Sequence, residues 1–236
     1  REALQMDPQQ RMLLELAWRA MEDASVSVDT LARVSTGVFV GVISHDFERL
    51  ALSDSRKINP HTGLGRSTSI AANRVSYTFN FRGPSISYDT ACSSSLVAVD
   101  AACRALNLNE CDTAFAGGAN TIVSPESYIE FSQAGMLSRS GKCHAFDARA
   151  DGFVRAEGGG LVLLKRFADA LVDGDRIRGV ILATSVNQDG TTAGLMAPSS
   201  KAQTEMMQTA LESAGMEAFD VGYVEAPGTG TQFGDP

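Results

Sequence analysis

Apolar residues near the N-terminus recur at helical spacing and then give way to a continuous apolar run. Asp7 can cap a helix whose first residue, Pro8, suits that position. The apolar residues that follow at three- and four-residue spacing are Met12, Leu13, Leu16, Ala20, Met21 and Ala24. Residues 37–43 are apolar on both faces, which is typical of a buried parallel strand. The pattern predicts a helix that leads into a central strand.

Strand-like and helix-like patterns alternate along the rest of the chain. Helices are predicted over 69–79, 93–108, 125–136, 167–172 and 199–214, and strands over 85–89, 112–123, 153–155, 160–165, 179–186 and 221–225. We expect strands 153–155 and 160–165 to pair with each other, and residues 45–66 to form an irregular excursion. The helix over 93–108 is apolar almost all round, so we expect it to be buried. The alternation indicates an α/β fold with a layered, mostly parallel sheet.

Composition and charge narrow the class of protein. The 236 residues are 44% hydrophobic and 20% charged, which excludes collagen, coiled coil and disorder. The net charge of -8 argues against a nucleic-acid partner, because no basic excess is available to neutralise phosphates. No apolar run approaches the roughly 18 residues of a membrane helix. The N-terminus has neither an initiator Met nor a signal peptide, and we expect a chain truncated at both ends.

Cys92 is the first candidate for chemistry. The other three cysteines are Cys103, Cys111 and Cys143; none of the four forms a CxxC pair, which favours reduced thiols and a cytoplasmic location. Cys92 lies where a predicted strand meets a predicted helix, and a helix N-terminus favours a thiolate and can steady an oxyanion. The alternative is a small buried hydrophobe, which is how we interpret Cys103. Cys111 and Cys143 are interpreted as structural.

Glycine runs and histidines add two weaker signals. Residues 158–160 and 228–231 are glycine-rich, but no Gly-Lys-Ser/Thr follows, so nucleotide binding rests on glycine content alone. The three histidines, His45, His61 and His144, have no spacing that ties them to Cys92. No His, Cys and Asp cluster has ligand spacing, so no metal site is expected.

Several motifs in order give the chain a family resemblance. They are Asp7 to Arg11, Gly83 to Leu96 around Cys92, Phe146-Asp147, Ala150 to Phe153, Glu157-Gly158, Val186 to Gly190, Ala197 to Ser199, Val224 to Ala226, Gly228 to Thr231 and Gly234 to Pro236. With these motifs the chain resembles the β-ketoacyl synthase (ketosynthase) domain of a modular type I polyketide synthase.

The resemblance implies a fold and an assembly. The fold is a thiolase-like α-β-α-β-α layered sandwich with mixed, mostly parallel sheets. Residues 1–166 would be most of the N-terminal half and residues 167–236 the start of the C-terminal half. The resemblance also implies a homodimer, with the strand before Cys92 near the two-fold axis, and neighbouring polyketide synthase domains.

The resemblance also implies the reaction. Cys92 would accept an acyl chain from an acyl carrier protein as a thioester. A malonyl-type extender on a second carrier would lose CO2, and its enolate would attack that thioester. Thr229 and Thr231 match the threonines that bind the phosphopantetheine arm of the carrier. No cofactor is expected to bind the chain directly.

One position departs from the family pattern. Pro227 stands where the family has its first catalytic histidine, and the second histidine belongs to a segment beyond Pro236. Proline has no titratable ring and no N–H, and losing an oxyanion donor costs on the order of 10²–10³ in rate. Condensation is therefore in question, and loading of Cys92 should survive better. The alternatives are a non-elongating transacylase, an error at this codon, or a catalytically silent dimer that docks carriers.

Carrier docking raises a question of charge, because acyl carrier proteins are acidic and so is this chain. A local basic patch would resolve it. The arginines considered for such a patch are Arg49, Arg56, Arg66 and Arg82, whose ordinary role would be solvated surface.

Overall fold

The computed structural model describes residues 2–232 and 234–235, which separate into two compact units. Unit 1 comprises Arg1–Ser124 and Ala156–Val180, and unit 2 comprises Pro125–Arg155 and Ile181–Pro236. Unit 1 contains helices α1 (Pro8–Ala24), α2 (Val28–Ala32), α3 (Asp46–Leu52), α4 (Thr62–Arg66), α5 (Ser69–Phe79), α6 (Ser94–Asn107) and α8 (Phe167–Asp173). Its strands are β1 (Thr36–Gly41), β2 (Ser85–Tyr88), β3 (Thr113–Asn120) and β4 (Gly158–Lys165), and its 3₁₀ turns are η1 (Glu2–Gln5) and η2 (Ser55–Lys57). Unit 2 contains α7 (Glu126–Gln133), α9 (Ser200–Ala214) and the 3₁₀ turn η3 (Ala218–Asp220).

The sheet of unit 1 has four strands in the order β2-β1-β3-β4. Strands β2 and β3 run parallel to β1, and β4 runs antiparallel to β3. The expectation that residues 153–155 pair with 160–165 is wrong. Strand β4 pairs with β3 instead, and Phe153 makes an isolated bridge to Leu137. The long β3 ladder offers β4 eight register partners, which a short strand at 153–155 does not offer.

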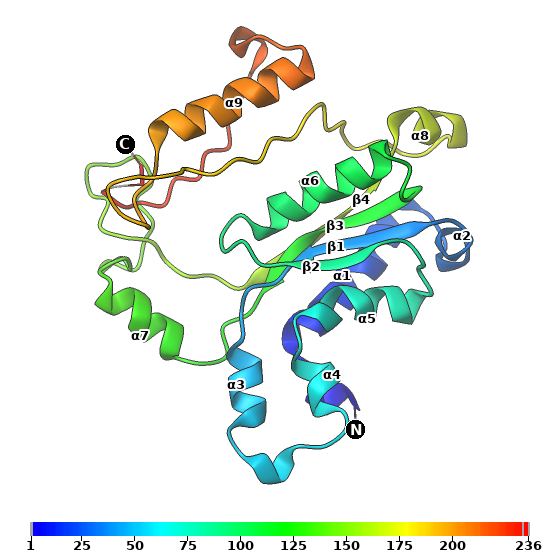
Figure 1. The fold of residues 1–236 in the computed structure, drawn as a ribbon, viewed down its shortest axis with the longest axis horizontal. Coiled ribbons are helices and arrows are strands. Elements are labelled where there is room, and N and C mark those ends of the chain that lie inside the picture. The colour runs from blue at the N-terminus through cyan, green and yellow to red at the C-terminus, as the bar shows by residue number, and fades with distance from the viewer. Residues whose placement is uncertain (1, 233, 236) are drawn as a thin grey trace. The chain divides into compact units, whose positions relative to one another are not determined.

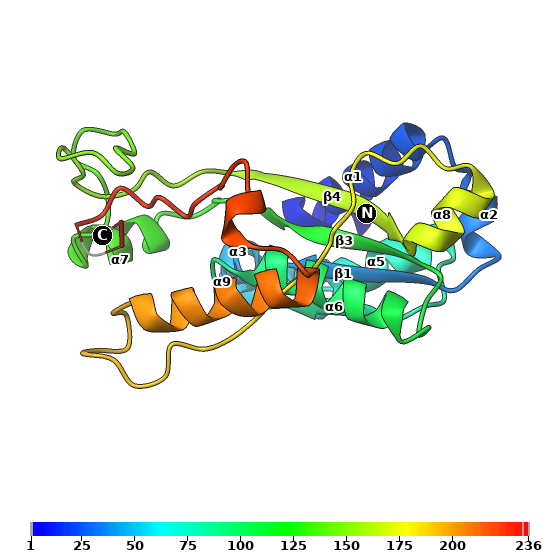
Figure 2. The ribbon, with the colours of Figure 1, turned by 90° about the horizontal axis from the view of Figure 1, so that it is seen from above.

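Helices cover both faces of this sheet (Figures 1 and 2). Helices α1 and α5 pack on one face and α6 packs on the other. The α1/α5 face has a core that includes Leu13, Val38, Val40, Val75 and Phe115. The α6 face has a core that includes Phe39, Ala98, Ala102, Ala114 and Ala116. Both faces of β1 are buried, as its uninterrupted apolar sequence predicts.

Helix α6 differs from the helix that its composition predicts. Its inner face carries small residues such as Ala98 and Ala102, which are fully buried against the strands. Its opposite face is not covered within unit 1, and the side chain of Leu96 is 73% exposed. The expectation of a helix buried all round is therefore wrong for this unit, because one sheet covers only one face.

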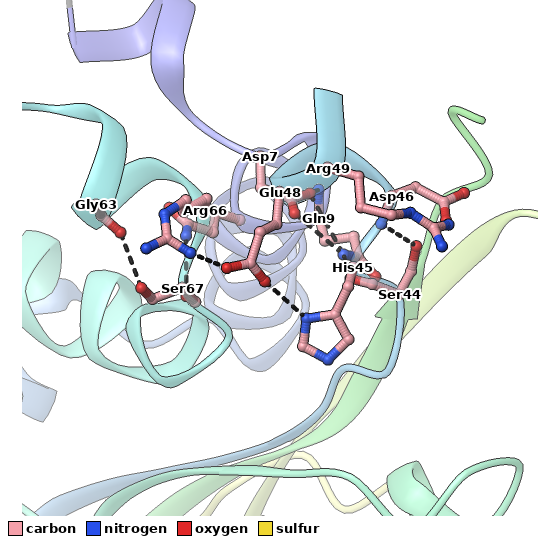
Figure 3. Close-up of polar contacts among 11 residues, drawn as sticks. Asp7, Gln9, Ser44, His45, Asp46, Glu48, Arg49, Gly63, Arg66 and Ser67 are labelled. Atoms are coloured by element: carbon pink, nitrogen blue, oxygen red, sulfur yellow. Dashed lines mark hydrogen bonds and ion pairs between the residues drawn. The ribbon is translucent and has the colours of Figure 1, made fainter. Parts of the chain in front are cut away.

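Residues 45–66 are more regular than expected, because they contain α3, η2 and α4. Polar contacts hold these short helices (Figure 3), and this is why an apolar period does not reveal them. Asp46 is 4% exposed and accepts the N–H groups of Val123 and Ser124 at 3.3 Å each. Glu48 bonds Nδ1 of His45 at 3.1 Å and also pairs with Arg66.

The start of α1 joins this polar layer through the first residues of the Asp7 to Arg11 motif. Asp7 caps the helix by accepting the N–H of Gln9 at 2.8 Å. The buried amide of Gln9 donates to the carbonyl of Ser44 at 3.1 Å. Gln10 donates to the carbonyl of Gly65 and accepts from Nε of Arg74 at 2.6 Å. The motif therefore anchors α1 to the segment that carries α3 and α4 and to α5.

Unit 2 has fewer buried side chains. Helix α9 begins with Ser199 accepting the N–H of Ala202 at 3.2 Å and ends at Gly215 in the left-handed conformation, which confirms the helix predicted over 199–214. Of its residues only Ala202 is buried, and α7 has no buried residue.

The strands predicted at 179–186 and 221–225 do not form within the described residues. A strand needs a neighbour to receive its backbone hydrogen bonds, and these segments have none there. Their apolar side chains stay accessible, with Leu182 62% and Val224 67% exposed. Separately, none of the helices in residues 2–232 is both long enough and apolar enough to span a bilayer.

Candidate active site

Cys92 lies in the tight turn between β2 and α6, and it is exposed. The backbone at Ala91 has φ 54°, a left-handed conformation that costs a non-glycine residue about 1–2 kcal/mol. Hydroxyl groups hold the turn in this shape. Ser94 Oγ accepts the N–H of Thr90 at 2.9 Å and donates to the carbonyl of Ala91 at 2.6 Å. Ser93 Oγ donates to the carbonyl of Thr90 at 2.8 Å.

The N-terminus of α6 rests directly on the sheet. A Cβ at Gly41, the last residue of β1, would lie 2.6 Å from backbone atoms of Ser94 and Ser95. A Cβ at Gly118 in β3 would lie 2.7 Å from the carbonyl oxygen of Gly41 and 3.2 Å from Cβ of Ser95. Only glycine permits this approach at both positions. The strand ends therefore set where the Cys92 turn sits, and close packing accounts for Gly118 without a nucleotide.

A hollow of about 560 Å³ lies beside the Cys92 turn. Its walls are Gly41, Ile43, Ala91, Cys92, Ser94, Ser95, Leu96, Val99, Ala116, Gly117, Gly118, Ala119, Asn120, Gly158, Gly159, Gly160 and Val162. Cys92 thus combines solvent access, an adjacent hollow and a position beside the N-terminus of α6, whose N–H groups can steady an oxyanion. Its exposure excludes the alternative of a small buried hydrophobe.

The other cysteines lack this combination. Cys111 is 1% exposed in the core beneath α6, and burial raises the pKa of its thiol. Burial also raises the pKa of the Cys103 thiol. Cys143 is exposed in unit 2, where its Sγ accepts the N–H of Val154 at 3.1 Å. The burial of Cys111 agrees with a packing role, whereas the structural role expected for the exposed Cys143 stays a prediction.

Thr229 and Thr231 lie together in an exposed loop of unit 2. Their Oγ1 atoms are 2.9 Å apart. Thr231 Oγ1 also accepts the N–H of Gly234 at 3.0 Å. The structure therefore brings the two predicted binding residues into one hydrogen-bonded pair.

Asp235 holds this loop, although the sequence pattern assigns it no role. Its Oδ1 accepts the N–H of Gly230 at 2.9 Å and the hydroxyl of Thr229 at 3.2 Å. Its Oδ2 accepts the N–H of Phe146 at 2.7 Å, and Phe146 itself has φ 57°. These donors, the Phe146 N–H first, lower the pKa of the carboxyl. The signals in the sequence are that Asp235 closely follows the two threonines and stands within the Gly234 to Pro236 motif.

Pro227 occupies a three-residue turn. The N–H of Gly228 donates to the carbonyl of Ala226 at 2.8 Å, which closes the turn around Pro227. A proline fits such a turn because its φ is already fixed near the required value.

None of the three histidines is seen to take the part of the imidazole expected at position 227. His45 bonds Glu48, and His61 lies at the start of α4. His144 lies in unit 2, where its carbonyl accepts the N–H of Asp147 at 3.2 Å. In the part of the chain that the structure describes, no histidine bonds Cys92, and no His, Cys, Asp and Glu side chains group to hold a metal ion.

Three of the four arginines considered for carrier docking are paired with carboxylates. Arg49 bonds Asp46 at 2.6 Å, Arg56 bonds Asp54 at 2.9 Å, and Arg66 pairs with Glu48. Arg82 is exposed in the turn before β2. The three paired charges are offset locally, which weakens the idea of a basic patch at these positions.

Comparison with known proteins identifies the family. Residues 1–170 match the beta-ketoacyl synthase N-terminal domain, and residues 178–236 match the beta-ketoacyl synthase C-terminal domain. A phenolphthiocerol/phthiocerol polyketide synthase of Mycobacterium tuberculosis is 50% identical over 235 residues, which are 100% of this chain and 12% of that protein. Probable polyketide synthase 1 of Dictyostelium discoideum is 45% identical over 240 residues, which are 100% of this chain and 8% of that protein.

Solved structures agree with the sequence relatives. A ketosynthase domain for oxazolomycin from Streptomyces albus JA3453 has a TM-score of 0.93 and 44% identity, covering 99% of this chain and 40% of that one. The ketosynthase from module 6 of the bacillaene synthase of Bacillus subtilis 168 has a TM-score of 0.90 and 43% identity, covering 98% and 39%. They confirm the thiolase-like α/β fold class. The chain belongs to the β-ketoacyl synthase family and spans a part of the ketosynthase domain.

Proposed function

We propose that this chain belongs to a ketosynthase of polyketide biosynthesis and that Cys92 receives the acyl group. Residues 1–166 form most of the N-terminal half of that domain, and residues 167–236 begin the C-terminal half. The observation that carries the proposal is the position of Cys92, accessible in a hydrogen-bonded strand-to-helix turn at the N-terminus of α6. Polyketide synthases among the relatives support it.

The loading step needs a thiolate and a group that stabilises an oxyanion, and it does not need the histidine that Pro227 replaces. The Cys92 thiolate attacks the carbonyl of an acyl thioester carried on the phosphopantetheine of an acyl carrier protein. A new S–C bond forms, the C–S bond to the carrier breaks, and the carrier thiolate takes up a proton. The α6 N-terminus stabilises the oxyanion of the tetrahedral intermediate, while Thr229 and Thr231 hold the arm.

The extension step also needs a group that donates a hydrogen bond to the enolate oxygen. In the family, a malonyl-type extender loses CO2, and the enolate carbon attacks the Cys92 thioester, forming the C–C bond and releasing the thiolate. Pro227 cannot donate a hydrogen bond to that enolate. We expect extension to fall by on the order of 10²–10³ relative to a domain with histidine there, while loading is retained. The chain would then transfer acyl groups without elongating them.

Two kinds of partner accompany this function. One is the acyl carrier protein, delivered by neighbouring domains of a polyketide synthase. The other is a second copy of the chain. Strand β2 is an edge of the sheet and pairs only with β1 within it, so its outer side is free to meet the β2 of a partner.

Intact-protein mass spectrometry on the natural protein that contains this sequence tests the proposal. The protein is first given an acyl-pantetheine thioester and then a malonyl-loaded carrier protein. We expect an acyl adduct that Cys92→Ala abolishes and that Cys143→Ala, which removes the other exposed thiol, leaves intact. We expect no β-ketoacyl product, and restoration of the product in Pro227→His.

The outcomes separate three functions. An adduct without product supports acyl transfer alone. An adduct that turns over at a normal rate refutes the selective loss argued from Pro227. If no adduct forms on Cys92, the second candidate holds: a catalytically silent module that dimerises and docks carriers.

A further inference from the structure

The hydrogen bonds around Thr229 and Thr231 have a fixed direction. A threonine hydroxyl has one proton to donate and two lone pairs that accept. Thr229 donates its proton to the carboxylate of Asp235 at 3.2 Å. The 2.9 Å contact between the two hydroxyls must then carry the proton of Thr231 towards Thr229.

Counting donors and acceptors in this way leaves each threonine hydroxyl with one free lone pair and no free proton. Thr229 accepts from Thr231, and Thr231 accepts the N–H of Gly234 at 3.0 Å. The direction runs from the Gly234 N–H through both hydroxyls to the Asp235 carboxylate. We propose that Asp235 makes this loop an acceptor-only site, which recognises the amide N–H groups of a pantetheine arm rather than its carbonyls.

Asp235 can set this direction because it is a carboxylate. Three donors point at its two oxygens, namely the Phe146 N–H at 2.7 Å, the Gly230 N–H at 2.9 Å and the Thr229 hydroxyl. An ionised carboxylate only accepts, whereas an amide at this position would offer a donor at one of the two oxygen sites. The lowered pKa of Asp235 keeps it ionised at neutral pH.

The carboxylate also fixes where the acceptors lie. Its bond to Phe146 joins the Thr229 loop to a segment 89 residues away in sequence. The N–H of Gly152 donates to the carbonyl of Gly230 at 2.9 Å and makes a second tie to that region. Asp235 is therefore a positioning residue that acts through Thr229. This inference rests on the proposed function, because it assumes that the threonines meet the arm.

A binding experiment tests the direction without catalysis. The natural protein carrying Cys92→Ala is titrated, by ligand-observed NMR, with S-ethyl pantetheine and with its analogue in which both amide N–H groups are replaced by ester oxygens. Each lost hydrogen bond should cost about 2- to 10-fold in Kd, so we expect the amide ligand to bind about tenfold more tightly. Equal binding, or no binding of either ligand, overturns the inference.

Variants distinguish a change in hydrogen-bond direction at Thr229 from a general loss of structure in the loop. Thr229→Val and Asp235→Asn should each reduce the amide preference to less than threefold. Thr209→Val removes a hydroxyl that donates to a helix carbonyl in α9, and Glu212→Gln removes one exposed carboxylate from the same helix; both should keep the full preference. An Asp235→Asn protein that retains the full preference overturns the role of Asp235.

The two hypotheses fail in different experiments. Acylation of Cys92 tests the proposed function, whereas the amide preference of the Cys92→Ala protein tests the direction at Thr229. A protein that loads an acyl group but binds both ligands equally refutes only the inference.

Discussion

The Cys92 turn and the Thr229 loop are held in shape by different physical means. The Cys92 turn lies against a buried sheet, where Gly41 and Gly118 let α6 approach the strand ends. The Thr229 loop is exposed and depends on the charge of Asp235. The comparison teaches that the Cys92 turn should be sensitive to added volume under α6, whereas the shape of the Thr229 loop should depend on the ionised carboxylate of Asp235 and change only at acid pH.

The largest expected effect is that of added volume under α6. Gly41→Ala would place a Cβ 2.6 Å from backbone atoms of Ser94 and Ser95, so the helix must shift. We expect a loss of about 3 kcal/mol in the free energy of unfolding and a slower acylation of Cys92. Urea unfolding measures the first effect and mass spectrometry the second.

Gly63→Ala is the matched control for this substitution. A Cβ at Gly63 meets no atom within 4 Å, so its effect should stay within about 0.5 kcal/mol. If the two variants have equal stability, α6 does not rest on Gly41 in the way described.

A smaller effect should follow from changing the backbone preference of the turn itself. Ala91→Val places a β-branched residue at φ 54°. We expect it to destabilise the protein by about 1–2 kcal/mol, measured by urea unfolding. Ala91→Gly should be at least as stable as the unmutated chain, because glycine adopts this conformation freely. A valine variant of unchanged stability would show that the turn relaxes to another shape.

The smallest expected effect concerns pH and the binding loop. The folded pKa of Asp235 is depressed below its ordinary value of 3.8, so its contribution is fully present above that value. It is lost only as the pH falls through the lower folded pKa. Hydrogen exchange at Gly230 and Phe146, corrected for intrinsic rates, should therefore not change between pH 7 and about pH 5. A loss of protection near neutral pH would contradict this assignment.

Local signals were sufficient to predict the longer helices, such as α1, α6 and α9. The Asp7 cap starts α1 where expected, and Ser199 and Gly215 bound α9. The place of Cys92 between a strand and a helix could also be predicted, because that transition is visible in the residues around it. The family motifs point to Thr229 and Thr231, whose role in binding stays a prediction.

Contacts between residues that are far apart in the sequence could not be predicted. Residues 179–186 have a pattern like that of β1, yet no strand forms there among the described residues because a ladder partner is not a local property. The segment 45–66 folds through Asp46 and Glu48, whose partners lie elsewhere in the chain. Asp235 acts across 89 residues, so no local pattern reveals its role.

The contrast in exposure among the cysteines provides an internal reporter. Cys92 and Cys143 are open to a thiol-selective reagent, whereas Cys111 is sealed beneath α6. Labelling of Cys111 requires the layer between α6 and the sheet to open. The rate at which Cys111 reacts in a chain without the two exposed thiols therefore measures how often α6 separates from the sheet.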